Sequence, residues 1–184
     1  MKFDTSIVQT RIQSPLGDMV LAATRQGLAG AWFTDQRHLP EALDFKNVPH
    51  AWPTHDSHPM LLEAARQLAE FFSGKRKVFD LRLDINGGTL FQQSVWRALV
   101  KIPYGKTTSY GSISLQIDNP AAVRAVGSAV GRNPLSLIVP CHRVLGGDGS
   151  LTGYAGGLHR KTALLELESA VLQTGAALLT APLF

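Results

Sequence analysis

Alternation of apolar and polar residues marks the first 34 positions and predicts β-strands. Val8, Thr10 and Ile12 alternate with polar neighbours, and short apolar runs occupy 19–22 and 28–33. The sequence SPLG separates the first two of these segments and is typical of a turn. The pattern therefore predicts an antiparallel meander of strands over 7–34.

A helical pattern follows a long connection. Residues 35–58 are rich in Pro, His and Asp and show no period. From Pro59 to Phe72 the apolar residues recur at helical spacing, which predicts a helix. Proline suits the first turn of a helix, with Ser57 or His58 as its cap.

The stretch from 78 to 89 closes the first half of the chain. The apolar residues within 78–85 predict one further strand. Residues 86–89, with the sequence NGGT, have the composition of a linker, and the charge of the chain changes there. We therefore predict a supporting domain over 1–88, made of a small sheet and a helix, and a second domain over 89–184.

The second half is dominated by short helical patterns. Apolar residues at helical spacing predict helices over 91–102 and, after the capping pair 108–109, through Ile117. Residues 118–120 predict a tight turn, and the small residues of 121–130 predict a second helix. Two short helices across a tight turn indicate a helix-turn-helix. Small residues are equally typical of a helix packed inside its own domain, and the pattern alone leaves both interpretations open.

Charge and composition narrow the function. The chain has 184 residues and a net charge of +4; residues 1–90 are neutral, so the excess of Lys and Arg lies in the second half. A basic half favours an anionic partner, of which nucleic acid is the commonest, although a solubility charge would look the same. One cysteine excludes a disulfide framework within the chain and a zinc site of several thiolates.

Membrane and targeting signals are not apparent in the sequence. No run of eighteen apolar residues occurs, residues 1–20 hold no stretch of signal-peptide length, and the apolar residues 175–184 are too short to span a membrane. We expect a cytoplasmic monomer that needs no metal and no cofactor, because the reducing compartment suits a protein without disulfides.

The single cysteine, Cys141, is the candidate for chemistry. A lone cysteine is usually a small buried hydrophobe, but His142 and Arg143 follow it, and both favour the reactive thiolate. Neighbouring side chains on a strand point to opposite faces, so a water molecule could be needed between Cys141 and His142. Glycines near Tyr154 permit the close backbone approach of a ligand pocket. Glu168 is either a solvated acid on a helix or the group that orients His142.

The chain resembles the methylated-DNA–protein-cysteine methyltransferases, also called O6-alkylguanine-DNA alkyltransferases. The resemblance covers about half of the chain, and the N-terminal half is similar in general layout alone. It rests on these segments: PCHRV at 140–144, GYAGG at 153–157, KTALLELE at 161–168, FQQSVW at 91–96, YG at 110–111 and RAVG at 124–127.

The resemblance implies four catalytic residues. Cys141 would take the alkyl group from the O6 position of guanine in double-stranded DNA and keep it. His142 would act as a base through a water molecule, and Glu168 would orient His142. Asn133 would brace the turn that presents the cysteine. Each molecule would then act once, because a thioether is not readily reversed.

The resemblance also implies a set of residues that bind DNA and the flipped base. Arg124 would enter the duplex and fill the place of the extruded nucleotide, and Ala122 belongs to the same contact. An arginine on a small-residue helix suits the negative potential of the minor groove. Tyr110 would lie against the phosphate and donate to the base. The base pocket would be formed by Tyr154, Val144 and Ala155.

The implied fold class is α+β. It comprises a small N-terminal antiparallel sheet with a helix, in a ribonuclease H-like layout, and a mostly helical C-terminal domain with a helix-turn-helix. Asp118 stands where the family often has glycine, and Asp tolerates the left-handed conformation. Two alternatives remain: a non-catalytic sensor of alkylated DNA, and a cysteine hydrolase built on Cys141 and His142. The family's activating members carry a zinc-binding cysteine cluster, which one cysteine rules out.

Overall fold

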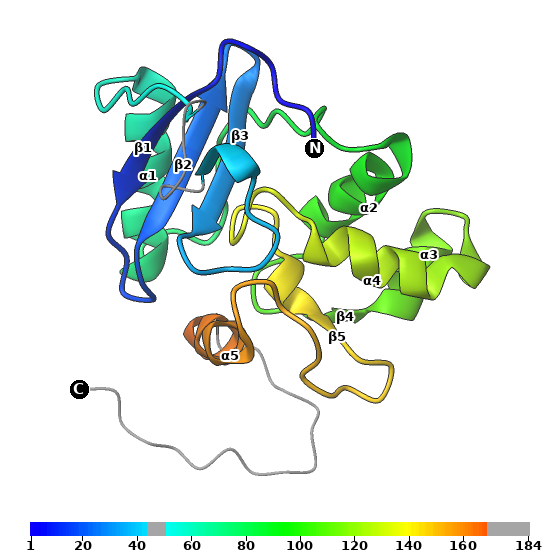
Figure 1. The fold of residues 1–184 in the computed structure, drawn as a ribbon. Helices are drawn as coiled ribbons and strands as arrows, with labels where there is room; N and C mark the ends of the chain where they lie inside the picture. Colours follow the sequence, from blue (N-terminus) through cyan, green and yellow to red (C-terminus); the bar gives the residue numbers. More distant parts are fainter. Residues whose placement is uncertain (44–50, 169–184) are drawn as a thin grey trace.

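The fold joins a small sheet to a cluster of short helices (Figure 1). The computed structural model describes residues 1–43 and 51–168, and the apolar residues 175–184 lie outside this part of the chain. The expected α+β class is confirmed. No helix within 1–43 or 51–168 is long and apolar enough to cross a membrane.

The predicted meander is confirmed as a three-stranded antiparallel sheet in the order β1-β2-β3. Its strands are β1 (Val8–Ile12), β2 (Met19–Thr24) and β3 (Gly27–Phe33). Met19 pairs with both Ile12 and Phe33, and the register of β2 against β3 shifts between Ala22 and Ala23. A short 3-10 helix, η1 (Glu41–Leu43), follows the sheet.

Both faces of the sheet are buried, each by a different partner. The helix α1 (Pro59–Phe72) covers one face of the sheet (Figure 1). Met19 and Leu21 share one apolar core with it. Val20 and Ala22 face the other way, where Trp32 packs edge-on against Phe3. The helix α1 begins at Pro59 as predicted, but its cap residue His58 makes no side-chain capping bond.

The prediction of a further strand over 78–85 is wrong, because these residues form no regular strand. The segment makes one isolated parallel bridge to β3, in which the Leu28 amide donates to Arg82 and the Asp84 amide donates back to Leu28. Gln67 of α1 bonds both the amide and the carbonyl of Asp80. The segment is therefore held both by two main-chain bonds to β3 and by a helix side chain, and its alternating apolar residues pack on the core.

Short helices build the second half as predicted. They are α2 (Leu90–Val100), α3 (Tyr110–Gln116), α4 (Val123–Gly131) and α5 (Leu158–Leu167). Thr89 and Gln92 cap α2 reciprocally, and Ser109 caps α3 through the amide of Ser112. These bonds satisfy amide groups that a helix start leaves without partners.

The turn between α3 and α4 has the predicted position but a different entry into the second helix. Asp118 adopts the left-handed conformation with φ 56°. Pro120–Ala122 forms a 3-10 turn, η2, so α4 begins at Val123 rather than at 121. Proline has no amide hydrogen to donate, which suits it to this first turn. The helices α3 and α4 pack against each other, as a helix-turn-helix requires.

The sheet and the helical part share one continuous core, which contains Leu21 of β2 and Trp96 of α2. They are also joined through the main chain: the Ala31 amide donates to Pro134, and the Ser136 amide donates to Ala31. The edge of β3 thus pairs with the loop that follows α4. The division at 88/89 stays a prediction, although each half has its own set of elements.

Candidate active site around Cys141

Cys141 lies in a 3-10 turn, η3 (Cys141–Arg143), and not on the strand that the sequence suggested. Pro140 precedes the turn, and a two-residue strand, β5 (Val144–Leu145), follows it. The strand β5 pairs in parallel with β4 (Thr108–Ser109), which leads directly into α3. The cysteine is 4% exposed, so any reactant must enter a pocket to reach it.

Asn133 holds the sulfur and its loop together. Its Nδ2 lies 3.0 Å from Cys141 Sγ and 2.8 Å from the carbonyl of Val139, while its Oδ1 accepts from the Leu135 amide. Between these contacts Leu137 has φ 69°, a conformation that is rare for a side chain of this size. The buried side-chain amide of Asn133 therefore holds a strained loop in place and fixes the position of the sulfur at its end.

His142 and Glu168 form the second half of the site. The Nε2 atom of His142 lies 2.9 Å from Glu168 Oε1, and both side chains are fully buried. Burial alone would raise the pKa of Glu168, but the hydrogen bonds from His142 and Arg143 outweigh it and lower the pKa to about 2. Burial lowers the pKa of His142. Because Glu168 is an ionised acceptor, the Nε2 atom carries the proton of a neutral imidazole.

The other ring nitrogen, His142 Nδ1, is buried and has no hydrogen-bond partner among the described residues. It is therefore available as a proton acceptor on a neutral ring. Burial raises the pKa of the Cys141 thiol, against the opposing effect of the Asn133 bond and the charge of Lys161. The resting cysteine is consequently a thiol, and its activation needs a base.

Arg143 acts differently from the sequence-based expectation that it favours the thiolate. Its Nε and Nη2 atoms donate to the two oxygens of Glu168 at 2.8 and 2.7 Å, and Nη1 donates to the carbonyl of Ile102. The amide of Gly105 completes the shell at 3.2 Å from Glu168 Oε2. The arginine thus neutralises and holds the carboxylate that orients His142.

The predicted pocket residues lie on the start of α3 and on the segment that follows the cysteine. Tyr154 and Val144 are buried, and a charge on Cys141 would raise the pKa of Tyr154 further beyond the rise that burial causes. The Tyr110 hydroxyl lies 3.4 Å from the carbonyls of Thr152 and Gly153. Ala155 accepts a bond from the Arg37 amide. A Cβ atom at Gly156 would lie 2.8 Å from the Tyr154 ring, which explains the glycine.

Arg124 and Ala122 lie at the start of the second helix of the helix-turn-helix. Val126, Ala129 and Val130 bury one side of α4, whereas Arg124 is exposed and Ala122 is half-buried. One side of α4 is thus packed inside its own domain, and contact of its exposed side with nucleic acid stays a prediction. A small exposed surface with one arginine suits close approach to a nucleic acid.

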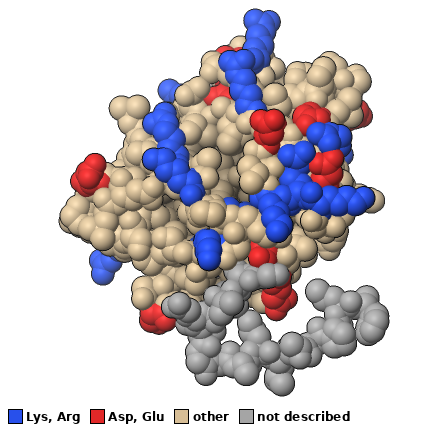
Figure 2. Space-filling model, turned by 180° about the vertical axis from the view of Figure 1, so that it is seen from behind, with Lys and Arg blue, Asp and Glu red and all other residues tan. Residues whose placement is uncertain are grey.

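Basic side chains also lie on the back of the molecule, as seen from the view of Figure 1. Figure 2 shows Lys and Arg scattered over the back of the molecule, with Asp and Glu mixed among them on the flank formed by α1. In the first half of the chain the acidic residues balance the basic ones, so the net charge of +4 comes from the second half.

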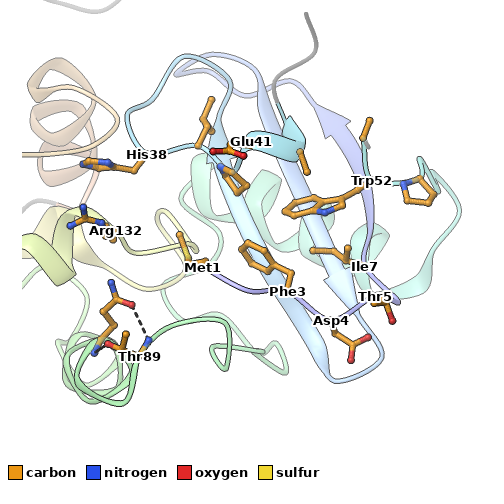
Figure 3. A pocket seen from close by; sticks show the side chains of 16 residues that line it. Met1, Phe3, Asp4, Thr5, Ile7, His38, Glu41, Trp52, Thr89 and Arg132 are labelled. Atoms are coloured by element: carbon orange, nitrogen blue, oxygen red, sulfur yellow. Dashed lines mark hydrogen bonds between the residues drawn. The ribbon is translucent and has the colours of Figure 1, made fainter. Parts of the chain in front are cut away.

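A separate cavity of about 990 Å³ lies between the N-terminal segment and the start of α2 (Figure 3). Phe3 and Trp52 line one side, and Thr89 and Arg132 line the other. None of the predicted site residues lines it. Within the described ranges, no group of three or more His, Cys, Asp or Glu side chains is placed to hold a metal ion.

Several residues that support the site were not predicted from the sequence. Lys161 is fully buried and bonds two main-chain carbonyls of the pocket wall. Gln36 accepts from the Ser136 hydroxyl and the Phe33 amide, and Arg160 connects Asp35 with the carbonyl of Gly156. The spacing of Lys161 on its helix, three and four residues before two buried leucines, is the signal that could have indicated its burial.

The fold and the site together define a class of protein: a helix-turn-helix beside a buried cysteine that is served by a neutral histidine and an ionised glutamate. Two family models match the chain. The ribonuclease-like domain of 6-O-methylguanine DNA methyltransferase matches residues 7–85, and the DNA-binding domain of the same family matches residues 90–170.

Individual proteins that are similar to this chain point to the same family as the two family models. A methylated-DNA–protein-cysteine methyltransferase of Methanosarcina barkeri is 47% identical over 85% of this chain and 94% of its own length. One from Mycobacterium tuberculosis is 46% identical over 85% and 89%. The crystal structure of Mycobacterium tuberculosis OGT in complex with DNA has a TM-score of 0.76 and 45% identity, and it covers 88% of this chain and 92% of that one. The chain belongs to the methylated-DNA–protein-cysteine methyltransferase family.

Proposed function

We propose that the protein repairs DNA by moving an alkyl group from the O6 position of guanine to Cys141, once per molecule. The observation that carries this proposal is the pairing of His142 with Glu168 beside a cysteine held by Asn133. The names of the relatives and the DNA complex of one of them support the same reaction. O4-alkylthymine is a second candidate substrate.

The target atom lies inside the base stack, and Cys141 lies inside the protein. The guanine must therefore leave the duplex and enter the pocket. Arg124, exposed on α4, would occupy the vacated place in the duplex, and Ala122 would allow the backbone to approach the groove. Tyr154 and the main chain at Val144 and Ala155 would hold the flipped base.

The chemistry follows from the protonation states. The thiol proton of Cys141 passes through a water molecule to Nδ1 of His142, and Glu168 stabilises the resulting imidazolium. The thiolate attacks the alkyl carbon, so the S–C bond forms as the bond from that carbon to O6 breaks. The guanine takes up a proton, for which the Tyr110 hydroxyl is the donor. The product is an S-alkylcysteine without a nucleophile to cleave it, so the protein acts once.

The non-catalytic sensor is not favoured, because the cysteine and its complete hydrogen-bond shell are present. The hydrolase alternative leaves the exposed Arg124 helix without a purpose. We further infer that the protein works as a monomer in the cytoplasm, where its free cysteine stays reduced.

The test is to incubate the protein with a duplex that contains one O6-methylguanine and to measure its intact mass. We expect a gain of one methyl group on the Cys141 peptide for each lesion repaired, and none for Cys141→Ser. Tight binding to the lesion without a mass change would instead indicate a sensor, and continuous ester hydrolysis at Cys141 would indicate a hydrolase.

A further inference from the structure

Arg160 of α5 is a buried arginine that contacts three separate segments of the chain. Its side chain is 8% exposed. The Nε atom donates to the carbonyl of Leu16 at 2.7 Å, and Nη1 donates to the carbonyl of Gly156 at 2.9 Å. Nη1 and Nη2 also lie 2.9 and 3.1 Å from the two carboxylate oxygens of Asp35. One guanidinium group therefore joins the turn before β2, the segment after β3 and the segment before α5.

The first half of the chain is shaped around this guanidinium. Its central carbon lies 4.2 Å from the centroid of the Phe33 ring, which is within the range of a cation–π contact. Phe33 ends β3 and is fully buried. Gly17 has φ 113°, and a Cβ atom there would lie 2.9 Å from Nη2 of Arg160. Glycine at this position leaves room for the arginine and adopts a backbone conformation that other residues rarely take.

Gly156, which accepts one of the bonds from Arg160, lies against two aromatic rings. A Cβ atom on Gly156 would lie 2.8 Å from the Tyr154 ring and 3.2 Å from the Phe33 ring. Tyr154 is buried, and we propose above that it holds the flipped base. A movement of Gly156 away from Arg160 would therefore shift the Tyr154 ring or open the space beside it.

The ion pair with Asp35 does not by itself account for the arginine. The Asp35 side chain is 65% exposed, and an ion pair with an exposed carboxylate contributes little because water screens it. The planar guanidinium presents several N–H groups in a fixed fork, whereas a lysine ammonium is a single point charge. Position 160 therefore supplies a geometry that reaches Leu16 and Gly156 at the same time, in addition to a charge.

We infer that Arg160 is a positioning residue of the alkyl transfer, which fastens the pocket wall at Gly156 and Tyr154 to the sheet and so gives the first half of the chain a part in holding the flipped base. The inference rests on the proposed function for its role in repair. Arg160 acts through the main chain of 154–156. It should therefore change how fast a bound base reacts, whereas the binding of DNA would depend on the exposed residues of α4.

The experiment follows methyl transfer from an O6-methylguanine duplex in a single turnover, over a range of protein concentrations. It compares the wild-type protein with Arg160→Met, Arg160→Lys and Asp35→Asn, and with Arg97→Met as a control at an exposed arginine of the same half. In the Met variant we expect the limiting rate to fall about tenfold, because a base held off the attack geometry reacts slowly. The half-saturating concentration should stay within about twofold of the wild type, because the proposed DNA contacts are intact.

The other variants separate geometry from charge. Arg160→Lys keeps the charge beside Asp35 but lacks the fork, so its limiting rate should also fall, and it serves if the Met variant does not fold. Asp35→Asn keeps an oxygen acceptor at an exposed position and should retain most of the rate, and the Arg97 control should match the wild type. A lower unfolding midpoint with an unchanged limiting rate of the active fraction would overturn the inference, as would a loss confined to the half-saturating concentration.

A measurement without DNA tests the same contact. Hydrogen exchange of the amides in 153–157 should become faster in both Arg160 variants, because their anchor at Gly156 is lost, and exchange in α3 should not change. Unchanged exchange in 153–157 would contradict the inference. A wild-type protein that transfers no methyl group, with faster exchange in the two variants, would refute the proposed function and leave the fastening of the 153–157 segment by Arg160 intact.

Discussion

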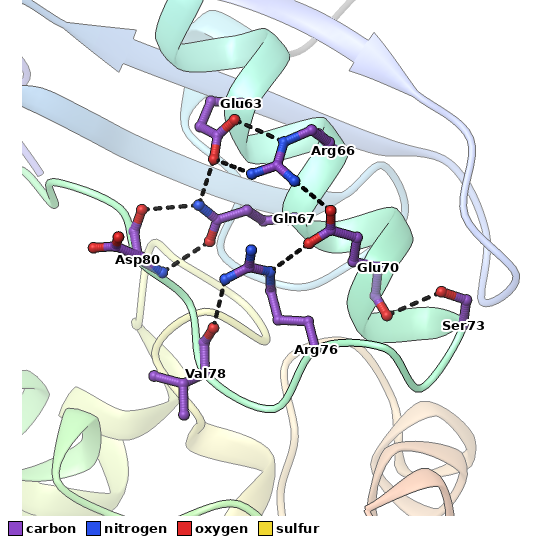
Figure 4. Close-up of polar contacts among 8 residues, drawn as sticks. All are labelled: Glu63, Arg66, Gln67, Glu70, Ser73, Arg76, Val78 and Asp80. Atoms are coloured by element: carbon purple, nitrogen blue, oxygen red, sulfur yellow. Dashed lines mark hydrogen bonds and ion pairs between the residues drawn. The ribbon is translucent and has the colours of Figure 1, made fainter.

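In two places in this molecule a glutamate accepts hydrogen bonds from two basic side chains, and the two sites differ in their exposure to water. On α1, Glu70 accepts from Arg66 and Arg76 at the surface (Figure 4). In the site, Glu168 accepts from Arg143 and His142 with no exposed side-chain surface of its own. The first cluster is partly exposed to solvent, and the side chains of the second are almost fully buried.

The difference shows what each cluster does. Exposed ion pairs contribute little to stability, because water and salt screen them. A buried pair loses its hydration, and it persists because each partner would be left uncompensated without the other. The α1 cluster therefore adds little to stability, whereas the buried cluster orients His142, whose ring is kept neutral by burial. The buried contact in Figure 4 that matters structurally is neutral: Gln67 holds the main chain of Asp80 at 2.8 Å twice.

The largest expected effect comes from Glu168→Gln. The substitution leaves the Arg143 guanidinium buried without a charged partner, which costs about 3–5 kcal/mol in the free energy of unfolding. It also removes the anion that stabilises the protonated His142, so methyl transfer should slow by about 10²-fold or more. Urea unfolding and single-turnover repair of an O6-methylguanine duplex measure the two effects.

Glu166→Gln is the matched control, because Glu166 is exposed on the same helix. It should change neither quantity. If Glu168→Gln unfolded at the same urea concentration as the wild type, the buried cluster would be no different in kind from the one on α1.

The loss of stability at low pH should be the effect of intermediate size, and it should differ between the two clusters. The pKa of Glu168 is lowered from 4.5 to about 2, so its contribution is complete above pH 4.5 and is lost as the pH falls toward 2. The lowered pKa of His142 acts in the same direction, because the unfolded chain binds a proton below about pH 6.5 and the folded one resists it. The loss from Glu168 amounts to at most about 3 kcal/mol.

High salt distinguishes the stability lost at Glu168 from the stability lost at the surface cluster on α1. Hydrogen bonds from Arg66 and Gln67 lower the pKa of the exposed Glu63 to about 2 as well. Screening in 1 M salt should remove the contribution of Glu63 and leave that of Glu168. Urea unfolding at pH 7, 5 and 3, in low and high salt, measures both. An acid sensitivity that vanished in high salt, or that Glu168→Gln retained in full, would contradict the assignment to the buried cluster.

The sequence predicted the elements better than the partners of its polar residues. The meander, α1 and the helix-turn-helix follow from apolar periodicity and turn residues, which are local signals. The segment 78–85 has a strand-like pattern, but Gln67 takes up the main chain of Asp80. This contact comes from a side chain thirteen residues away, and periodicity does not report it.

The same limit applies to the site. Cys141 and His142 stand out because they are adjacent in a chain with one cysteine, and the family resemblance adds Glu168 and Asn133. The true partner of Arg143 is 25 residues away, and Gln36 reaches Ser136 across 100 residues. The second of these contacts arises when the first half of the chain packs on the helical part. The roles of the DNA-facing residues, Arg124 and Ala122, stay predictions.

The smallest expected effect comes from Glu70→Gln, the surface counterpart of the Glu168 variant. The two arginines that lose a charged partner, Arg66 and Arg76, are accessible to water, and Arg66 retains Glu63. The free energy of unfolding should therefore change by no more than about 0.5 kcal/mol. Methyl transfer should be unchanged, because α1 contributes no residue to the site. Urea unfolding in low and high salt checks the first expectation, and the difference from wild type should disappear in 1 M salt. A loss comparable to that of Glu168→Gln would mean that the surface cluster holds the 73–80 segment on the core, and burial would then not explain the contrast between the two glutamates.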